Sequence, residues 1–119
     1  MFVSSNILID GNTAGAGSYL NGAPDGGWTQ FDFGSVKLIT EIKFYQSGAT
    51  EHGVWQVQGS NNGTDFTDIG STFTLGGSTL QTITEISANE TFYRYYRLTK
   101  VSGTTSAGPW TYEFEFKIT

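Results

Sequence analysis

Residues 112–118 alternate strictly between apolar and charged side chains, and this pattern constrains the fold more than any other feature of the sequence. Phe and other apolar residues occupy the even positions, and Glu or Lys the odd ones. Successive side chains of a β-strand point to opposite faces, so such a segment has one buried and one solvated face. The pattern predicts an antiparallel strand that closes over a core.

Six further segments are predicted as strands, because they are short, rich in Thr, aromatic and β-branched residues, and bounded by Gly, Asn or Ser. The first is expected to end at Gly34, and in the second Ile42 and Phe44 are expected to face the core. The predicted strands span residues 28–34, 38–46, 55–60, 66–75, 80–86, 92–100 and 112–118.

Turn residues separate these strands at short intervals. The segment Asn61-Asn62-Gly63 predicts a tight hairpin, and Gly76-Gly77 predicts a second turn. Many short strands with regular turns favour an all-β antiparallel β-sandwich of the jelly-roll type, with about eight strands. At 119 residues the chain is expected to form a single domain over residues 1–119. Two long loops, over residues 11–27 and 102–109, are the segments where function is expected.

Composition excludes several functional classes. The formal net charge is −5 and the six Lys and Arg residues are scattered, so nucleic acid and anionic membranes are not expected partners. The absence of Cys excludes thiolate metal sites, thiol nucleophiles and disulfides. No apolar run is long enough to span a membrane, and the first residues do not form a signal peptide. An extracellular, cell-surface or virion location is expected, with any export signal outside this chain.

The sequence does not predict an enzyme. Glu113 and Glu115 are paired carboxylates of the kind that glycoside hydrolases use, but alternating Glu on a wet strand face is ordinary surface chemistry. No G-x-S-x-G nucleophile motif and no phosphate-binding Gly loop before a helix is present. We therefore assign no catalytic residues.

Several segments, in order along the chain, resemble the discoidin-like domains, which include the coagulation factor 5/8 type C domains and the family 32 carbohydrate-binding modules. The opening NILIDGN, the strand WTQFDFG and the hairpin WQVQGSNNGTDF are similar to the corresponding family motifs. So are the strands ITEIKF and RYYRL and the closing strand YEFEF. The resemblance implies a galactose-binding-like β-sandwich and a binding function. The chain lacks the Cys pair that joins the termini of the blood-clotting members, and so the resemblance does not extend to their phosphatidylserine binding.

The resemblance also implies a structural calcium ion. Family 32 modules hold it with the Asp of the opening motif, oxygens of the following loop and the Glu of the closing strand. Calcium requires six to eight oxygen ligands, which a loop rich in Asp, Asn and Thr can supply. The alternative is that Asp10-Gly11-Asn12 forms a simple turn. The calcium ligands carried over by motif are Asp10, Asn12, Thr13, Ser18 and Glu113.

Sugar binding requires an aromatic face beneath the ring and planar polar groups for its hydroxyls. In the resembled modules such groups lie on loops at one end of the sandwich. His52 is expected in a polar loop, either as an exposed residue without a role or as a hydrogen-bond partner of a hydroxyl. Trp110 is either a lid on the core or a stacking platform. The candidate ligand contacts are Tyr19, Asn21, Gln46, His52, Arg97 and Trp110.

Three further expectations concern aromatic and basic residues on strands. Trp28 and Trp55 begin strands and are expected to pack into the core, although Trp28 also follows the first long loop. Arg97 alternates with Tyr96 and Leu98 and is expected to point outward, either into a binding groove or toward a cross-strand carboxylate.

Two functions fit these observations. The first is a non-catalytic carbohydrate-binding or adhesion module for a cell-surface or polysaccharide glycan, galactose-like by resemblance and holding a structural calcium. The second is a structural or protein-interaction domain on the same fold, within a viral tail, capsid or cell-surface assembly of several subunits. A fold alone does not choose between them.

Overall fold

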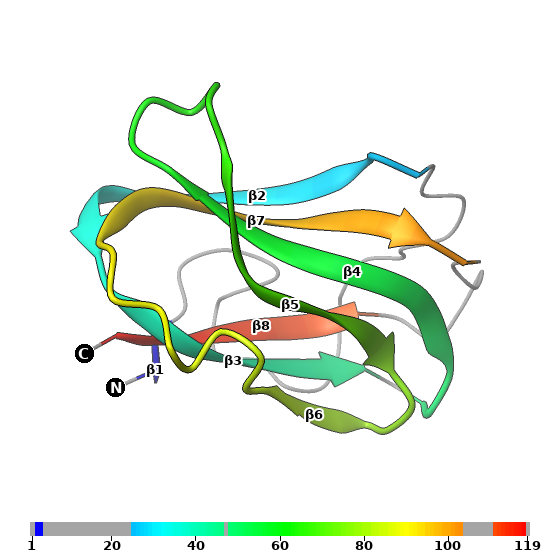
Figure 1. Ribbon diagram of the computed structural model, residues 1–119. Helices are drawn as coiled ribbons and strands as arrows, with labels where there is room; N and C mark the ends of the chain where they lie inside the picture. The colour runs from blue at the N-terminus through cyan, green and yellow to red at the C-terminus, as the bar shows by residue number, and fades with distance from the viewer. Residues whose placement is uncertain (1, 4–24, 47, 104–110, 119) are drawn as a thin grey trace.

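The chain forms two antiparallel β-sheets that face each other (Figure 1). The computed structural model describes residues 2–3, 25–46, 48–103 and 111–118. The strands are β1 (Phe2–Val3), β2 (Trp28–Lys37), β3 (Ile39–Gln46), β4 (Glu51–Ser60), β5 (Thr67–Gly76), β6 (Leu80–Ile83), β7 (Tyr93–Ser102) and β8 (Thr111–Ile118). No helix of the described part of the chain is long and apolar enough to cross a membrane.

One sheet has the strand order β1-β8-β3-β6 and the other has the order β2-β7-β4-β5. Apart from the β4–β5 hairpin, neighbours in each sheet are not consecutive in sequence, as in a jelly roll, and every pair is antiparallel. The prediction of an all-β antiparallel sandwich is therefore confirmed. The sheet that contains β7 matters most below, because it carries Arg97 in register with Gln30 on β2 and Gln58 on β4.

The core forms where the apolar positions of the alternating strands meet between the sheets. Phe114 and Phe116 of β8 are buried, as their period-two pattern predicts, and Phe116 meets Phe31 of β2 edge-to-face at 4.8 Å. Ile42 and Phe44 are fully buried, and Trp55 is 2% exposed, which confirms their predicted core positions. The buried apolar cluster comprises Phe31, Ile39, Ile42, Phe44, Trp55, Val57, Ile69, Phe73, Leu75, Ile83, Ile86, Tyr96, Leu98, Phe114 and Phe116.

Three strand boundaries differ from the prediction by three or more residues, and the others by at most two. Strand β2 does not end at Gly34 but continues to Lys37, and its register with β7 shifts between Asp32 and Lys37. Strand β4 begins at Glu51, four residues before the predicted start at Trp55, and it therefore includes His52. Strand β6 ends at Ile83, because the backbone turns after it and the Ser87 N–H bonds the Thr84 carbonyl.

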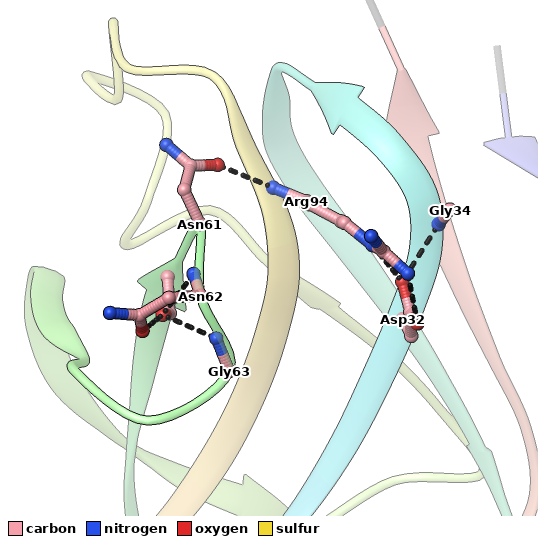
Figure 2. A network of polar contacts seen from close by, with 7 residues as sticks. Asp32, Gly34, Asn61, Asn62, Gly63 and Arg94 are labelled. Carbon is pink, nitrogen blue, oxygen red and sulfur yellow. Dashed lines mark hydrogen bonds and ion pairs between the residues drawn. The ribbon is translucent and has the colours of Figure 1, made fainter.

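The hairpin between β4 and β5 has the turn chemistry that its sequence predicts. Gly63 has a φ of 78°, a left-handed conformation that Gly adopts without a Cβ penalty. The Ser60 hydroxyl accepts the N–H of Gly63 at 3.0 Å, and the Asn62 side chain accepts the N–H groups of Thr64 and Asp65. These bonds stabilise the loop and place it beside the start of β7 (Figure 2).

At the same corner an ion pair ties β7 to β2. Arg94 donates from Nε and Nη2 to the two carboxylate oxygens of Asp32, at 2.8 and 3.0 Å, and its backbone N–H bonds the Asn61 side chain (Figure 2). The hydrogen bond from Arg94, together with that from the Gly34 N–H, lowers the pKa of Asp32 below its ordinary value. The corner thus joins three segments through polar contacts that remain exposed to solvent.

Candidate functional site

Two of the predicted ligand contacts, Gln46 and His52, form a buried pair. Gln46 is 3% exposed and His52 is fully buried, and the His52 Nε2 lies 2.7 Å from the Gln46 Oε1. The prediction that His52 lies in a polar loop is wrong, because β4 begins before it and carries it into the interior. Neither side chain presents a surface to a ligand in this conformation, so the pair acts on the loops around it.

The surrounding hydrogen bonds fix how the pair is protonated. The Gln46 Nε2 donates to the carbonyls of Thr50 and Ser78, at 3.0 and 2.9 Å, so its Oε1 is the acceptor in the bond with His52. His52 therefore carries a proton on Nε2, and burial lowers its pKa below the ordinary value, which favours the neutral form of the ring. The His52 carbonyl also accepts the indole N–H of Trp55 at 2.9 Å.

The pair holds two turns at one end of the sandwich. Through Gln46 it binds the segment before β4 and the turn between β5 and β6. Gly76 makes this approach possible, because a Cβ at that position would lie 2.2 Å from the Thr50 carbonyl oxygen and 3.1 Å from the His52 ring. Gln46 and His52 are thus positioning residues for this end of the molecule.

Arg97 lies on the outer face of the β2-β7-β4-β5 sheet, as its alternation with the buried Tyr96 and Leu98 predicts. Its guanidinium carbon lies 4.7 Å from the ring centre of Trp28 and 3.8 Å from that of Phe66. The predicted core position of Trp28 is wrong, because the residue is 58% exposed and lies on this outer face. The three side chains form what we call the Arg97 stack.

The polar neighbours of the stack fix its orientation. The Arg97 Nε and the Thr99 hydroxyl both donate to the Gln58 Oε1, at 2.7 and 2.9 Å. The Gln58 Nε2 in turn donates to Asp68 at 2.7 Å. The expected alternative, a cross-strand ion pair of Arg97, is not found: ion pairs of the described residues join Arg94 to Asp32 and Lys100 to Asp25. Arg97 is held by a neutral amide and its charge is not neutralised by a carboxylate in the described part of the chain.

The remaining predicted site residues lie outside the part of the chain whose side chains the structure describes. Glu113 is placed on β8 opposite Tyr45, and its side chain is not described. Among the described residues no group of three or more His, Cys, Asp or Glu side chains is arranged to hold a metal ion. The predicted contacts Tyr19, Asn21 and Trp110 and the predicted calcium ligands Asp10, Asn12, Thr13 and Ser18 lie outside the described residues.

The structure also has a shallow pocket that the sequence did not indicate. It has a volume of about 390 Å³ and lies between the start of β5 and the segment before β7. Asp68, Asn89, Glu90 and Tyr93 contribute to its lining, and none of the predicted contact residues does. It is separate from the Gln46–His52 pair, which shares no lining residue with it.

A signal for the exposed position of Trp28 was present in the sequence. Trp28 has the same parity along the strand as the polar residues Gln30 and Asp32, whereas Phe31 and Phe33 have the opposite parity. Strict period-two counting therefore places Trp28 on the wet face. Phe66 gives no comparable signal, because it lies in the hairpin, before β5 begins.

A comparison with known protein families shows to which family the chain belongs. The model of the coagulation factor 5/8 type C family described as the NedA-like, galactose-binding domain matches residues 8–98, which is most of the chain. The chain belongs to this family. The resemblance drawn from the motifs is thereby confirmed, and the two-sheet architecture agrees with it. No protein of curated function matches the sequence.

Several solved structures share the fold of this family member. The C-terminal domain of a chitobiase from Bacteroides fragilis is 19% identical, with a TM-score of 0.68, over 95% of this chain and 78% of that one. A chitosan-binding module from a Paenibacillus chitosanase/glucanase, solved with chitotriose, is 25% identical, with a TM-score of 0.63, over 92% and 82% of the two chains. A family 32 module from Clostridium perfringens, solved with GalNAc-β-1,3-galactose, is 18% identical, with a TM-score of 0.59, over 75% and 63%.

Proposed function

We propose that the protein is a non-catalytic carbohydrate-binding module that recognises a glycan on a cell surface or in a polysaccharide. The observation that carries this proposal is the family match over residues 8–98. Solved structures of the same fold contain chitotriose and GalNAc-β-1,3-galactose, which supports a glycan as the partner. An extracellular or surface location follows from where such glycans occur.

The geometry of one end of the sandwich supports loops as the place of binding. The buried Gln46–His52 pair anchors the segment before β4 and the β5–β6 turn, and so gives this end a rigid base. A binding site gains affinity when its loops are already held in the bound arrangement. We assign the contacts with the sugar to Tyr19, Asn21 and Trp110, and the anchoring of the segment before β4 and of the β5–β6 turn to Gln46 and His52.

The finer parts of the proposal are the sugar and the metal. A galactose-like sugar is the ligand that the family implies, with Trp110 stacking against the apolar face of the ring. A calcium ion held by Asp10, Asn12, Thr13, Ser18 and Glu113 would fasten the first loop to the closing strand. Its part is structural, since a calcium ion bound away from the sugar stabilises loops without touching the ligand.

A glycan array screen, with calcium present and again after chelation, tests the proposal. We expect binding to a narrow set of glycans, and Trp110→Ala is expected to abolish it with the melting temperature nearly unchanged. A large fall of the melting temperature would instead make Trp110 a core residue. If the folded protein binds no glycan, the proposal fails and the module is an interaction domain of a larger assembly.

A further inference from the structure

The outer face of the β2-β7-β4-β5 sheet contains a cation with unused hydrogen-bond donors. A guanidinium has five N–H groups, of which four are on the two Nη atoms. The Arg97 Nε donates to Gln58, and no hydrogen bond or ion pair from the Nη atoms is found within the described residues. Among the residues that the structure describes, four donors of this positively charged group therefore have no hydrogen-bond partner.

The aromatic neighbours limit the direction from which a ligand reaches Arg97. Trp28 comes from β2 and Phe66 from the hairpin before β5, and these lie on opposite sides of β7 in the sheet order. Aromatic rings stack on the flat faces of a guanidinium, where they exclude other groups. Gln58 occupies the Nε edge. With the two rings over the guanidinium and Gln58 at Nε, we infer that a ligand reaches the half-buried Arg97 at the edge that carries the Nη atoms.

The shape of this edge selects the ligand. Two parallel N–H groups in one plane match the two oxygens of a carboxylate, and such bidentate pairs are stronger than neutral hydrogen bonds. Beside the edge, the exposed indole of Trp28 and the exposed amide of Gln30 offer the apolar and polar contacts that a sugar ring uses. We propose that the Arg97 stack binds a carboxylate-bearing sugar, a uronic or sialic acid, within a glycan.

The net charge of the protein limits the number of acidic sugars that a preferred glycan ligand carries. A net charge of −5 repels dense polyanions at long range. Nearby, Arg94 is paired with Asp32, and the carboxylate of Asp68 is bonded to Gln58. One guanidinium edge takes one carboxylate, so the preferred ligand carries a single acidic sugar on an otherwise neutral chain.

This inference rests on the proposed function, since it assumes that the module binds glycans, and it adds a contact on the sheet face to those on the loops. Mutation can separate the proposed contacts on the loops from the proposed contact on the sheet face. Trp110→Ala removes the loop contact, whereas substitution of Arg97 removes the contact on the sheet face.

Titration of the ¹⁵N-labelled protein with matched oligosaccharides tests the inference. The acidic ligands are 3′-sialyllactose and xylotriose bearing one 4-O-methylglucuronic acid, and the neutral controls are lactose and xylotriose. We expect at least one acidic ligand to shift the indole N–H of Trp28 and the Nε–H of Arg97, and its neutral core to shift them at least tenfold more weakly. The indole N–H of Trp55, which is buried in the core, serves as the internal control. Whichever acid binds identifies the source of the carboxylate.

Two variants and a control complete the experiment. Arg97→Gln is expected to weaken binding of the acidic ligand at least tenfold, and Arg97→Lys to weaken it nearly as much, because Lys retains the charge but lacks the planar fork. Lys117→Gln removes the same charge from the other sheet and is expected to leave binding unchanged.

The inference is overturned if neither acidic ligand shifts Trp28, if acid and neutral core bind equally, or if folded Arg97→Gln retains full affinity. Glycan binding on the array would then stand and leave the proposed function intact. Absence of all glycan binding would remove both.

Discussion

At the residue scale, the protonation state of His52 has a measurable consequence for stability. Burial lowers the pKa of His52 in the folded chain, whereas the unfolded chain keeps the ordinary value of 6.5. Below that pH the unfolded state takes up the proton first, so the free energy of unfolding falls with falling pH, by at most about 1.4 kcal/mol per pH unit for one proton. At pH 7.5 and above the contribution of the neutral pair is fully present.

The matched variant is His52→Gln, which does not titrate and can still donate a hydrogen bond to Gln46. We expect urea unfolding to show that the wild-type protein loses stability relative to this variant between pH 7 and pH 5, because other titrating groups contribute equally to both. Parallel stability curves over this range would contradict a buried neutral His52.

At the element scale, the turn between β5 and β6 depends on Gly76. Its φ is 95°, and a Cβ would lie 2.2 Å from the Thr50 carbonyl oxygen and 3.2 Å from the Gln46 Nε2. Gly76→Ala therefore imposes both left-handed strain and a backbone clash, and we expect a loss of about 3 kcal/mol in the free energy of unfolding. Gly77→Ala is the control, because Gly77 has a φ of 88° but meets only the Glu51 side chain, at 3.6 Å.

Denaturant unfolding at neutral pH measures both variants. Gly77→Ala is expected to cost about 1 kcal/mol, the strain alone. Equal losses for the two variants would mean that the segment before β4 gives way to the added methyl group, and that the Gln46–His52 pair does not fix this end rigidly.

The elements also show what the sequence could and could not predict. Period-two alternation identified the β8 strand and its buried Phe114 and Phe116, because one face of the strand is solvated. It failed at His52, where β4 begins earlier than the turn-like residues before Trp55 suggest. It also cannot predict that Phe66 and Trp28 meet at Arg97, since that contact depends on strand order in the sheet, which no local pattern encodes.

At the scale of the whole molecule, the jelly-roll strand order forms two separate regions, the end held by Gln46 and His52 and the Arg97 stack. The residues of these two regions alternate along the sequence. Residues 46, 50, 52 and 78 meet at one end of the sandwich, through the hydrogen bonds of Gln46. Residues 28, 66 and 97 meet on the outer face of one sheet. A module that touches a glycan at both regions gains from their connection within one rigid body, because the second contact forms at high effective concentration.

The proposed calcium ion predicts a stability that depends on metal concentration for the whole domain. A ligand that binds the folded state alone adds about 2.7 kcal/mol at a concentration of 100 times its dissociation constant, which for a domain of this size raises the melting temperature by roughly 10 °C. We expect the protein in 1 mM CaCl₂ to melt higher by this order than the protein in EDTA, with Mg²⁺ giving a much smaller effect because it prefers a rigid octahedral site.

Asp10→Asn and Glu113→Gln are expected to abolish the difference in melting temperature between calcium and EDTA, whereas Asp65→Asn, in the hairpin, is expected to retain it. Identical calorimetric transitions in calcium and in EDTA would show that the Asp10-Gly11-Asn12 segment is a turn that binds no metal, and the glycan would then be bound on loops that the chain stabilises by its own contacts.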